Sequence, residues 1–339
     1  MSHTLSAPTL AADQHYEDLR GLWAELEAAL ALLLGAPLQV QNFAARLRQL
    51  GDWLQELVAH DSDAALYLMF QLAADSAAGY SASHALVTAT LCQVLAPELE
   101  LPAHERQALV SAAFTMNIGM TRLQDQLALQ REPPTAAQRA QIERHPLESQ
   151  ALLVRLFIDD PLWLEAVGAH HPQGKAPAPL AQLAAGQRLA RILAGVDRYA
   201  AMLSPRKSRS GRSATDSVRV IVGSEPAWGD EVGYALVRRV GLCPPGTLVR
   251  LDNGDTAVVL RRSSQPLMPL VARVLDASGQ PFKTPALHDT ARGAPRIEAA
   301  LARSALAQRI TPLTLALLGV YVGRSRPAPA AARREAPAS

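Results

Sequence analysis

Apolar residues recur at intervals of three and four along the first part of the chain, which is the spacing of amphipathic helices. One series runs through Leu19, Leu22, Trp23, Leu26 and Leu30, and another through Phe43, Leu47, Leu50, Trp53, Leu54 and Leu57. Gly35-Ala36-Pro37 separates the two, and Asp61-Ser62-Asp63 offers oxygens that can cap a third helix. We predict a helical N-terminal module over residues 1–78.

The helical pattern continues to residue 240, with recognisable start signals. Ser81 and Ser83 are predicted to cap the helix that carries His84. Thr135 with Gln138 forms a capping-box pattern, and Asp160-Pro161 is typical of an N-cap followed by proline in the first helical position. A long helix is expected over residues 181–203.

From Gly241 onward the pattern is that of strands. Residues 247–251, 256–260 and 270–275 are rich in valine and leucine, and Asn253-Gly254 between the first two is a strong hairpin signal. We therefore expect a small β extension with a C-terminal helix over residues 241–323, the helix covering about residues 310–322. Residues 324–339 are rich in proline and alanine and are expected to be disordered.

Composition agrees with a mainly α protein, because 49% of the 339 residues are hydrophobic and 4% are aromatic. The 33 basic and 31 acidic residues provide no overall field that would attract a nucleic acid polymer or an anionic membrane. No apolar run approaches the ~20 residues needed to span a bilayer, and no secretory signal is recognisable, so we expect a cytoplasmic protein without membrane insertion. Cys92 and Cys243 are expected to be reduced thiols.

The candidate chemistry lies in four histidines and an aspartate, in the order His84, His145, His170-His171 and Asp197. Neutral imidazole nitrogens and a carboxylate oxygen suit zinc, iron or manganese. Any one of these residues alone is more typical of a structural role, and their joint order is what indicates a metal site.

In that order, and with Pro146 directly after His145, the segment from about Tyr80 to Val240 resembles the HD-GYP family of metal-dependent phosphohydrolases, whose members hydrolyse the bacterial second messenger cyclic di-GMP. The resemblance implies an HD-type helical bundle over residues 79–240. It also implies that Asp197, in the segment from Leu189 to Arg206, is a metal ligand. The stretch from Gly241 to Leu260 is similar to a small extension often fused to that domain.

The sequence departs from the family at several decisive positions. Met116-Asn117 stand where the resemblance places a His-Asp pair, and Met120 stands where it places a lysine. A thioether is a poor ligand for these cations, and a neutral amide cannot supply a carboxylate that bridges two metals. Tyr80 replaces an acid found in members with a third metal, and residues 172–177 lack the Gly-Tyr-Pro signature.

The residual set implied by the resemblance is therefore His145, His170 and His171, with His84 and Asp197 as the remainder of a second site. Three imidazoles can hold a single divalent metal, whereas two ligands rarely hold a catalytic one. Loss of a metal pair removes the clamp for attacking and leaving oxygens, which indicates a catalytically degenerate domain. Such a domain would bind signalling proteins of the cyclic di-GMP network, and the nucleotide itself is a candidate ligand.

Two alternatives stay open at this point. The chain could be a working phosphodiesterase that uses a reduced one-metal site, with Asp197 or a water as base. It could also be a structural interaction module whose histidines are buried and hydrogen-bonded. Arg206, Lys207 and Arg209 follow the Asp197 helix and could bind phosphates, although a solvated loop is the more common role of such a run.

Overall fold

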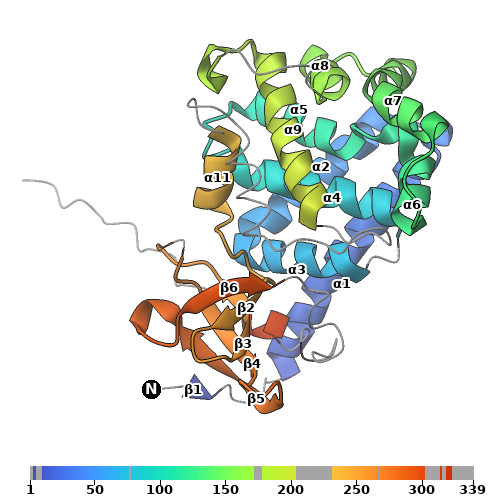
Figure 1. Cartoon of the computed structure of the whole chain (residues 1–339). Helices are drawn as coiled ribbons and strands as arrows, with labels where there is room; N and C mark the ends of the chain where they lie inside the picture. The colour runs from blue at the N-terminus through green and yellow to red at the C-terminus, as the bar shows by residue number, and fades with distance from the viewer. Residues whose placement is uncertain are drawn as a thin grey trace, which may run out of the picture.

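The computed structural model describes residues 3–4, 10–75, 78–171, 178–203, 231–265, 267–301, 314 and 318–322. It is mainly helical with one antiparallel sheet near the C-terminus, as predicted (Figure 1). The helices are α1 (Leu10–Gly35), α2 (Phe43–His60), α3 (Ser62–Asp75), α4 (Tyr80–Leu95), α5 (Ala103–Thr115), α6 (Thr121–Leu129), α7 (Ala136–Arg155), α8 (Pro161–Ala169), α9 (Ala185–Leu203) and α11 (Glu231–Arg239). Short 3-10 turns are η1 (Pro37–Gln39), η2 (Ile118–Met120), η3 (Leu180–Gln182) and η4 (Thr290–Arg292).

Helix α4 is the centre of the helical bundle. Every residue from Ser81 to Leu95 is buried, and α4 packs against α1, α3, α5 and α9. A helix that is surrounded on all sides needs no polar face, which explains why its sequence lacks a clear amphipathic period. His84 lies on this helix, so one candidate site residue is held in the core of the bundle.

Most of the predicted helix starts are confirmed. The Thr135 hydroxyl accepts a hydrogen bond from the Gln138 amide at 3.2 Å while the Gln138 side chain accepts one from the Thr135 amide at 2.8 Å, completing the capping box of α7. Asp160 caps α8 by accepting from the amides of Leu162 and Trp163, with Pro161 in the first position.

The predicted cap of α4 is wrong. Ser81 and Ser83 lie inside the helix, which begins at Tyr80 after Gly79, a glycine with φ of 102°. The carboxylate of Asp125 on α6 instead accepts from the Ser81 amide at 2.7 Å and from the Ser81 hydroxyl at 3.0 Å. A carboxylate 44 residues away thus satisfies the free end of α4, and no local pattern reveals it.

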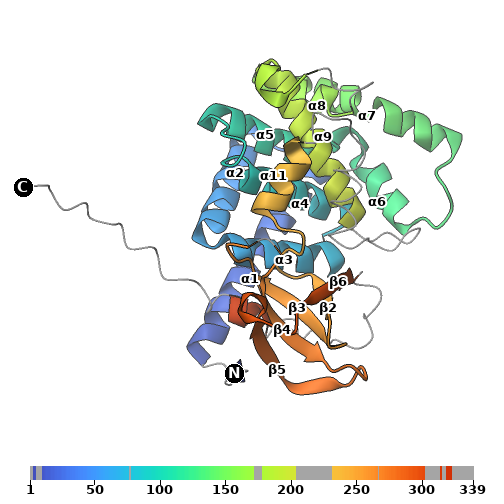
Figure 2. The ribbon, with the colours of Figure 1, turned by 60° about the vertical axis from the view of Figure 1, so that its left-hand side comes forward.

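The sheet has the strand order β1-β5-β4-β3-β2-β6. Its strands are β1 (His3–Thr4), β2 (Leu248–Leu251), β3 (Thr256–Arg261), β4 (Leu270–Leu275), β5 (Pro281–Asp289) and β6 (Ile297–Leu301), and all of its pairings are antiparallel. The predicted hairpin at Asn253-Gly254 joins β2 to β3, and Gly254 adopts a φ of 86°. Figures 1 and 2 show the sheet against the end of the bundle, with α3 lying over the strands.

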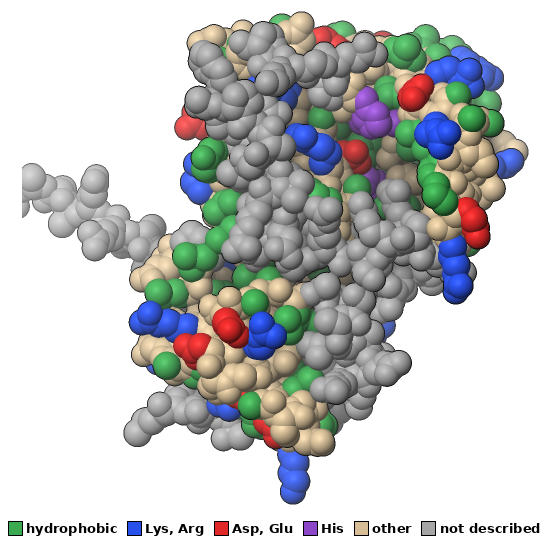
Figure 3. All heavy atoms as spheres, in the orientation of Figure 1, with side chains coloured by type: hydrophobic (Ala, Val, Ile, Leu, Met, Phe, Trp, Pro, Cys, Tyr) green, Lys and Arg blue, Asp and Glu red, His purple; other side chains and the backbone are tan. Residues whose placement is uncertain are grey.

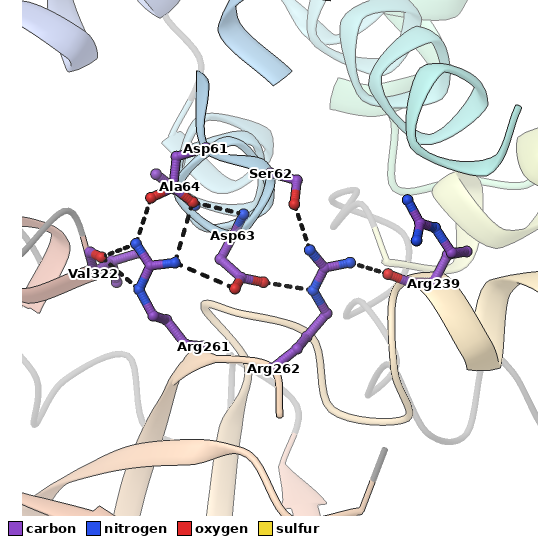
Figure 4. A network of polar contacts seen from close by, with 8 residues as sticks. All are labelled: Asp61, Ser62, Asp63, Ala64, Arg239, Arg261, Arg262 and Val322. Atoms are coloured by element: carbon purple, nitrogen blue, oxygen red, sulfur yellow. Dashed lines mark hydrogen bonds and ion pairs between the residues drawn. The ribbon is translucent and has the colours of Figure 1, made fainter. Parts of the chain in front are cut away.

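A buried arginine ties the sheet to the helices (Figure 4). Arg261, at the end of β3, is 6% exposed and forms an ion pair with Asp61, which is equally buried. Its guanidinium also donates to an oxygen of Asp63 at 3.4 Å and, through Nε, to the carbonyl of Val322 at 2.7 Å. Asp61 at the same time caps α3, because it accepts from the Asp63 amide at 3.0 Å. One cluster thus joins β3, the start of α3 and the C-terminal segment.

The described part of the C-terminal segment, residues 318–322, is helical, and Leu318 and Val322 are fully buried. These residues belong to the helix expected at about 310–322, and the expected disordered tail lies outside the described residues. Cys92 and Cys243 are free thiols. Among the described helices, none is long and apolar enough to cross a membrane.

Candidate metal centre

Three of the predicted site histidines come together where the C-terminal end of α8 meets α7. His145 projects from α7, and His170 and His171 follow the last residue of α8. Their candidate ligand nitrogens all lie within 4.8 Å of one another, and the Nε2 atoms of His145 and His170 are 3.1 Å apart. His145 and His170 are buried whereas His171 is exposed, so the group lies at the protein surface with one open side. Figure 3 shows histidine and acidic side chains beside one another on this part of the bundle.

The orientation of His145 follows from the proline beside it. Pro146 lies inside α7 and has no amide hydrogen, so the carbonyl of Ile142 lacks the donor that normally closes the helical turn. The Nδ1 of His145 lies 2.6 Å from that carbonyl oxygen and takes the place of the missing donor. This hydrogen bond puts the proton on Nδ1 and leaves Nε2 with a free lone pair.

His170 is oriented in the same way by a helix end. Its Nδ1 lies 2.7 Å from the carbonyl oxygen of Val167, in the last turn of α8, where carbonyls have no helical partner. Both buried rings thus donate from Nδ1 to the backbone and point Nε2 at each other. Backbone carbonyls that fix the tautomer in this manner are typical neighbours of metal-binding histidines.

The electrostatics of the two rings fit a cation. Burial lowers the pKa of His145 and of His170 to about 4, so both rings are neutral near pH 7. Two neutral rings whose Nε2 atoms are both acceptors cannot satisfy each other at 3.1 Å. A divalent cation between them and the His171 ring would satisfy both lone pairs, so this set of donors fits a metal such as zinc.

His84 and Asp197 form the second half of the predicted set. The Nε2 of His84 on α4 lies 2.7 Å from an oxygen of Asp197 on α9. Burial alone would raise the pKa of Asp197, but the hydrogen bond and charge interaction with His84, together with His170 and His171, lower it to about 2. Asp197 in turn opposes the lowering of the His145 and His170 pKa values, so the two halves lie within electrostatic reach of each other.

The His84 ring also contacts an aromatic ring, and its second nitrogen is buried. The ring of Tyr80 stacks on it with centroids 5.6 Å apart and planes 8° apart. Its Nδ1 is buried and, within the part of the chain that the structure describes, has no hydrogen-bond partner. Tyr80, which stands where the resemblance places an acid, thus presents an aromatic face to His84.

Met116 and Asn117, which stand where the resemblance places a His-Asp pair, belong to a segment whose ends contact α7 and α8. Thr115, directly before Met116, accepts a hydrogen bond from the Trp163 indole of α8 at 2.8 Å. The Gly119 amide donates to the Ser149 hydroxyl of α7 at 3.0 Å. Met116 is 1% exposed and packs in the core. The residues that flank Met116-Asn117 therefore contact the two helices that carry or precede the histidines, and position 116 itself offers a buried thioether.

Other parts of the predicted site are outside the described residues. Arg206, Lys207 and Arg209 fall in residues 204–230, and the loop after the histidine pair falls in residues 172–177. The pattern of histidines in the sequence did not indicate the role of Pro146. A proline inside a helical pattern, directly after a candidate ligand, is the signal that could have shown it.

Comparison with known proteins gives one informative match. The chain is 27% identical over 191 residues to the cyclic di-GMP phosphodiesterase PA4108 of Pseudomonas aeruginosa. The match covers 56% of this chain and 46% of that protein, so the chain spans about half the length of its curated relative. No known family profile matches the chain, and no solved structure matches it. The chain with this fold and this histidine group is thus distantly similar to one protein named as a cyclic di-GMP phosphodiesterase.

Proposed function

We propose that residues 79–240 form a catalytically degenerate HD-GYP-like domain that holds a single divalent metal and acts in cyclic di-GMP signalling by binding. The observation that carries this proposal is the group His145, His170 and His171, with two neutral Nε2 atoms 3.1 Å apart. The relationship to a cyclic di-GMP phosphodiesterase supports the nucleotide context. Residues 1–78 would be an accessory helical module and residues 241–323 an extension.

The metal would supply an electrophilic centre for an anionic ligand at the open side of the group. His145 and His170 would hold it through Nε2, with Nδ1 bonded to the backbone, and exposed His171 would complete the set. The carboxylate of Asp197 is held by His84 at 2.7 Å, which favours its role as a partly buried countercharge.

Loss of hydrolysis follows from what Met116 and Asn117 cannot provide. A second metal would need the bridging carboxylate and the extra imidazole that these side chains lack. Two metals about 3.5–4 Å apart would stabilise both the attacking and the leaving oxygen of a phosphodiester, and a single metal cannot stabilise both in this way. The domain would then serve as a binding unit for protein partners of the cyclic di-GMP network, with the nucleotide as a candidate ligand.

The test combines metal content with turnover. The purified protein, loaded anaerobically with Zn²⁺, Mn²⁺ or Fe²⁺, should contain about one metal per chain, and His170→Ala should contain none. Cyclic di-GMP should not be hydrolysed faster by the wild-type protein than by His170→Ala. Linear product that disappears in His170→Ala would support an active one-metal phosphodiesterase, and absence of metal from the wild-type protein would contradict the proposed site.

A restored variant sharpens the result. Met116→His with Asn117→Asp returns the missing imidazole and carboxylate to a segment that is already fixed between α7 and α8. We expect metal content to rise from about one to about two per chain. Unchanged metal content in a folded variant would show that the segment does not face the histidine group.

A further inference from the structure

A second cavity lies away from the histidines, where the start of α3, the end of α11 and the loop after β3 meet. Its volume is about 310 Å³, and its lining includes the side chains of Arg238, Arg239 and Arg262 together with Ser62 and Asp63. Three guanidinium groups against one carboxylate make this an electropositive cavity. None of the elements that carry the histidine site contributes to its lining among the described residues.

Two of the three arginines are already engaged. Arg238 forms an ion pair with Glu98, in the turn after α4. Arg262 donates to Asp63, to the Ser62 hydroxyl at 2.6 Å and to the backbone carbonyl of Arg239, as Figure 4 shows. These contacts hold Arg262 in place and offset its charge.

The side chain of Arg239 is different. Within the part of the chain that the structure describes it forms no ion pair, and its Nε is buried without a hydrogen-bond partner. A buried donor that belongs to a charged group is costly to leave unsatisfied. The carbonyl of Arg239 is fixed by Arg262, so the backbone from which this guanidinium extends is anchored at the cavity wall.

The other walls of the cavity favour an anion with several acceptor oxygens. The Ser62 hydroxyl accepts from Arg262, which leaves its own hydrogen available for donation. Ser62 is also the first residue of α3, whose N-terminal end carries partial positive charge. The charge of Asp63 is offset by Arg261 and Arg262, so it does not repel an incoming anion strongly.

We propose that this cavity binds a phosphate group, with Arg239 as its principal ligand and Arg262 and Ser62 as supporting donors. A guanidinium fork matches the geometry of phosphate oxygens and forms strong charge-assisted hydrogen bonds with them. The described lining contains no aromatic side chain on which a nucleobase would stack, so recognition is directed at the phosphate itself. Free phosphate and a small phosphomonoester share this chemistry.

A purely structural role for Arg239 makes a different prediction. Arg239 lies in the last turn of α11, where a positive charge complements the helix dipole. In that role its replacement would lower stability equally with and without phosphate. In a binding role its replacement would remove the response to phosphate.

The experiment is thermal unfolding of the full-length protein in inorganic phosphate, compared with chloride at equal ionic strength. The wild-type Tm should rise by a few degrees at phosphate concentrations about 100-fold above Kd. Arg239→Gln should need at least about tenfold more phosphate for the same rise. Arg292→Gln, an equal charge change on an exposed side chain of η4, should respond as the wild type does.

Two further arms complete the test. Arg239→Lys keeps the charge without the fork, so its response should be intermediate, and it replaces Arg239→Gln if that variant does not fold. The same titration with 5′-AMP separates the sources, since tighter binding of 5′-AMP identifies a phosphomonoester and equal or weaker binding identifies free phosphate. A wild-type Tm that rises equally in chloride, or an Arg239→Gln response equal to the wild-type one, would overturn the proposal.

Discussion

Replacing Pro146 with alanine should make the helix more stable and the metal site weaker. Alanine restores an amide hydrogen at position 146, four residues after Ile142, whose carbonyl now accepts from the His145 ring at 2.6 Å. A proline inside a helix costs about 3 kcal/mol relative to alanine, of which this adapted helix should recover about 1–3 kcal/mol. The restored amide competes for the carbonyl that fixes the His145 tautomer.

The expected loss at the site follows from that competition. Removing the partner that orients a metal-binding histidine typically costs 10- to 100-fold in affinity, which corresponds to about 1.4–2.7 kcal/mol. Zinc affinity of Pro146→Ala is measured by competition with a chromogenic chelator, and stability by urea unfolding of the metal-free protein. Leu147→Ala is the matched control, because Leu147 is the next residue of α7 and its side chain is 65% exposed.

The two readouts must move in opposite directions. Zinc affinity within twofold of the wild-type value in Pro146→Ala would refute the link between the proline and the ring orientation. A metal-free protein that becomes less stable would refute the argument about the helix. Leu147→Ala should leave both quantities near their wild-type values.

Three further predictions concern the core. Asp61→Asn should lower the free energy of unfolding by about 3 kcal/mol, because it leaves the buried guanidinium of Arg261 without its charged partner. Glu298→Gln, in a half-exposed ion pair, is the control and should lower it by less than about 1 kcal/mol. Equal losses for the two variants in urea unfolding would contradict the prediction. Burial lowers the pKa of His145 and His170 from 6.5 to about 4, so the unfolded chain binds more protons than the folded chain between these pH values. The free energy of unfolding of the metal-free protein should therefore fall as pH falls from 6.5 toward 4. A free energy of unfolding that does not change over this pH range would contradict the prediction. Gly119→Ala would place a Cβ 2.9 Å from a backbone nitrogen of α7, so we expect a loss of about 1–3 kcal/mol and weaker zinc binding, and an unchanged protein would show that the contact is loose.

Local signals predicted the parts of the fold that local chemistry decides. The capping box at Thr135 and the cap at Asp160 were read correctly because donor and acceptor lie within a few residues. The hairpin at Asn253-Gly254 was read correctly because the turn requires a positive φ that glycine supplies. Strands β5 and β6 were missed, since Pro281–Asp289 and Ile297–Leu301 show no clear alternation and are only partly buried.

The candidate site also has features that the sequence predicted and features that it did not. The order of the histidines predicted which residues meet, and the structure brings His145, His170 and His171 together and places His84 against Asp197. Their roles as metal ligands stay a prediction. The distances between rings and the neutral state of the buried pair depend on how α7 and α8 pack, which no local pattern contains. The Arg261–Asp61 ion pair was equally hidden, because its members are 200 residues apart.

The ion pair between Arg261 and Asp61 also limits where this protein can be divided. A truncation before Gly241 would remove the cation and leave Asp61 and Asp63 in a cluster of two negative charges at the start of α3. The isolated sheet would likewise expose Arg261, which pairs with Asp61 at the start of α3 in the whole chain. Expression of the helical part alone should therefore give a less soluble product than expression of the whole chain, although the sequence changes character at that point. The change in sequence pattern marks a change of secondary structure, and one cluster of buried apolar side chains includes residues from both sides of it.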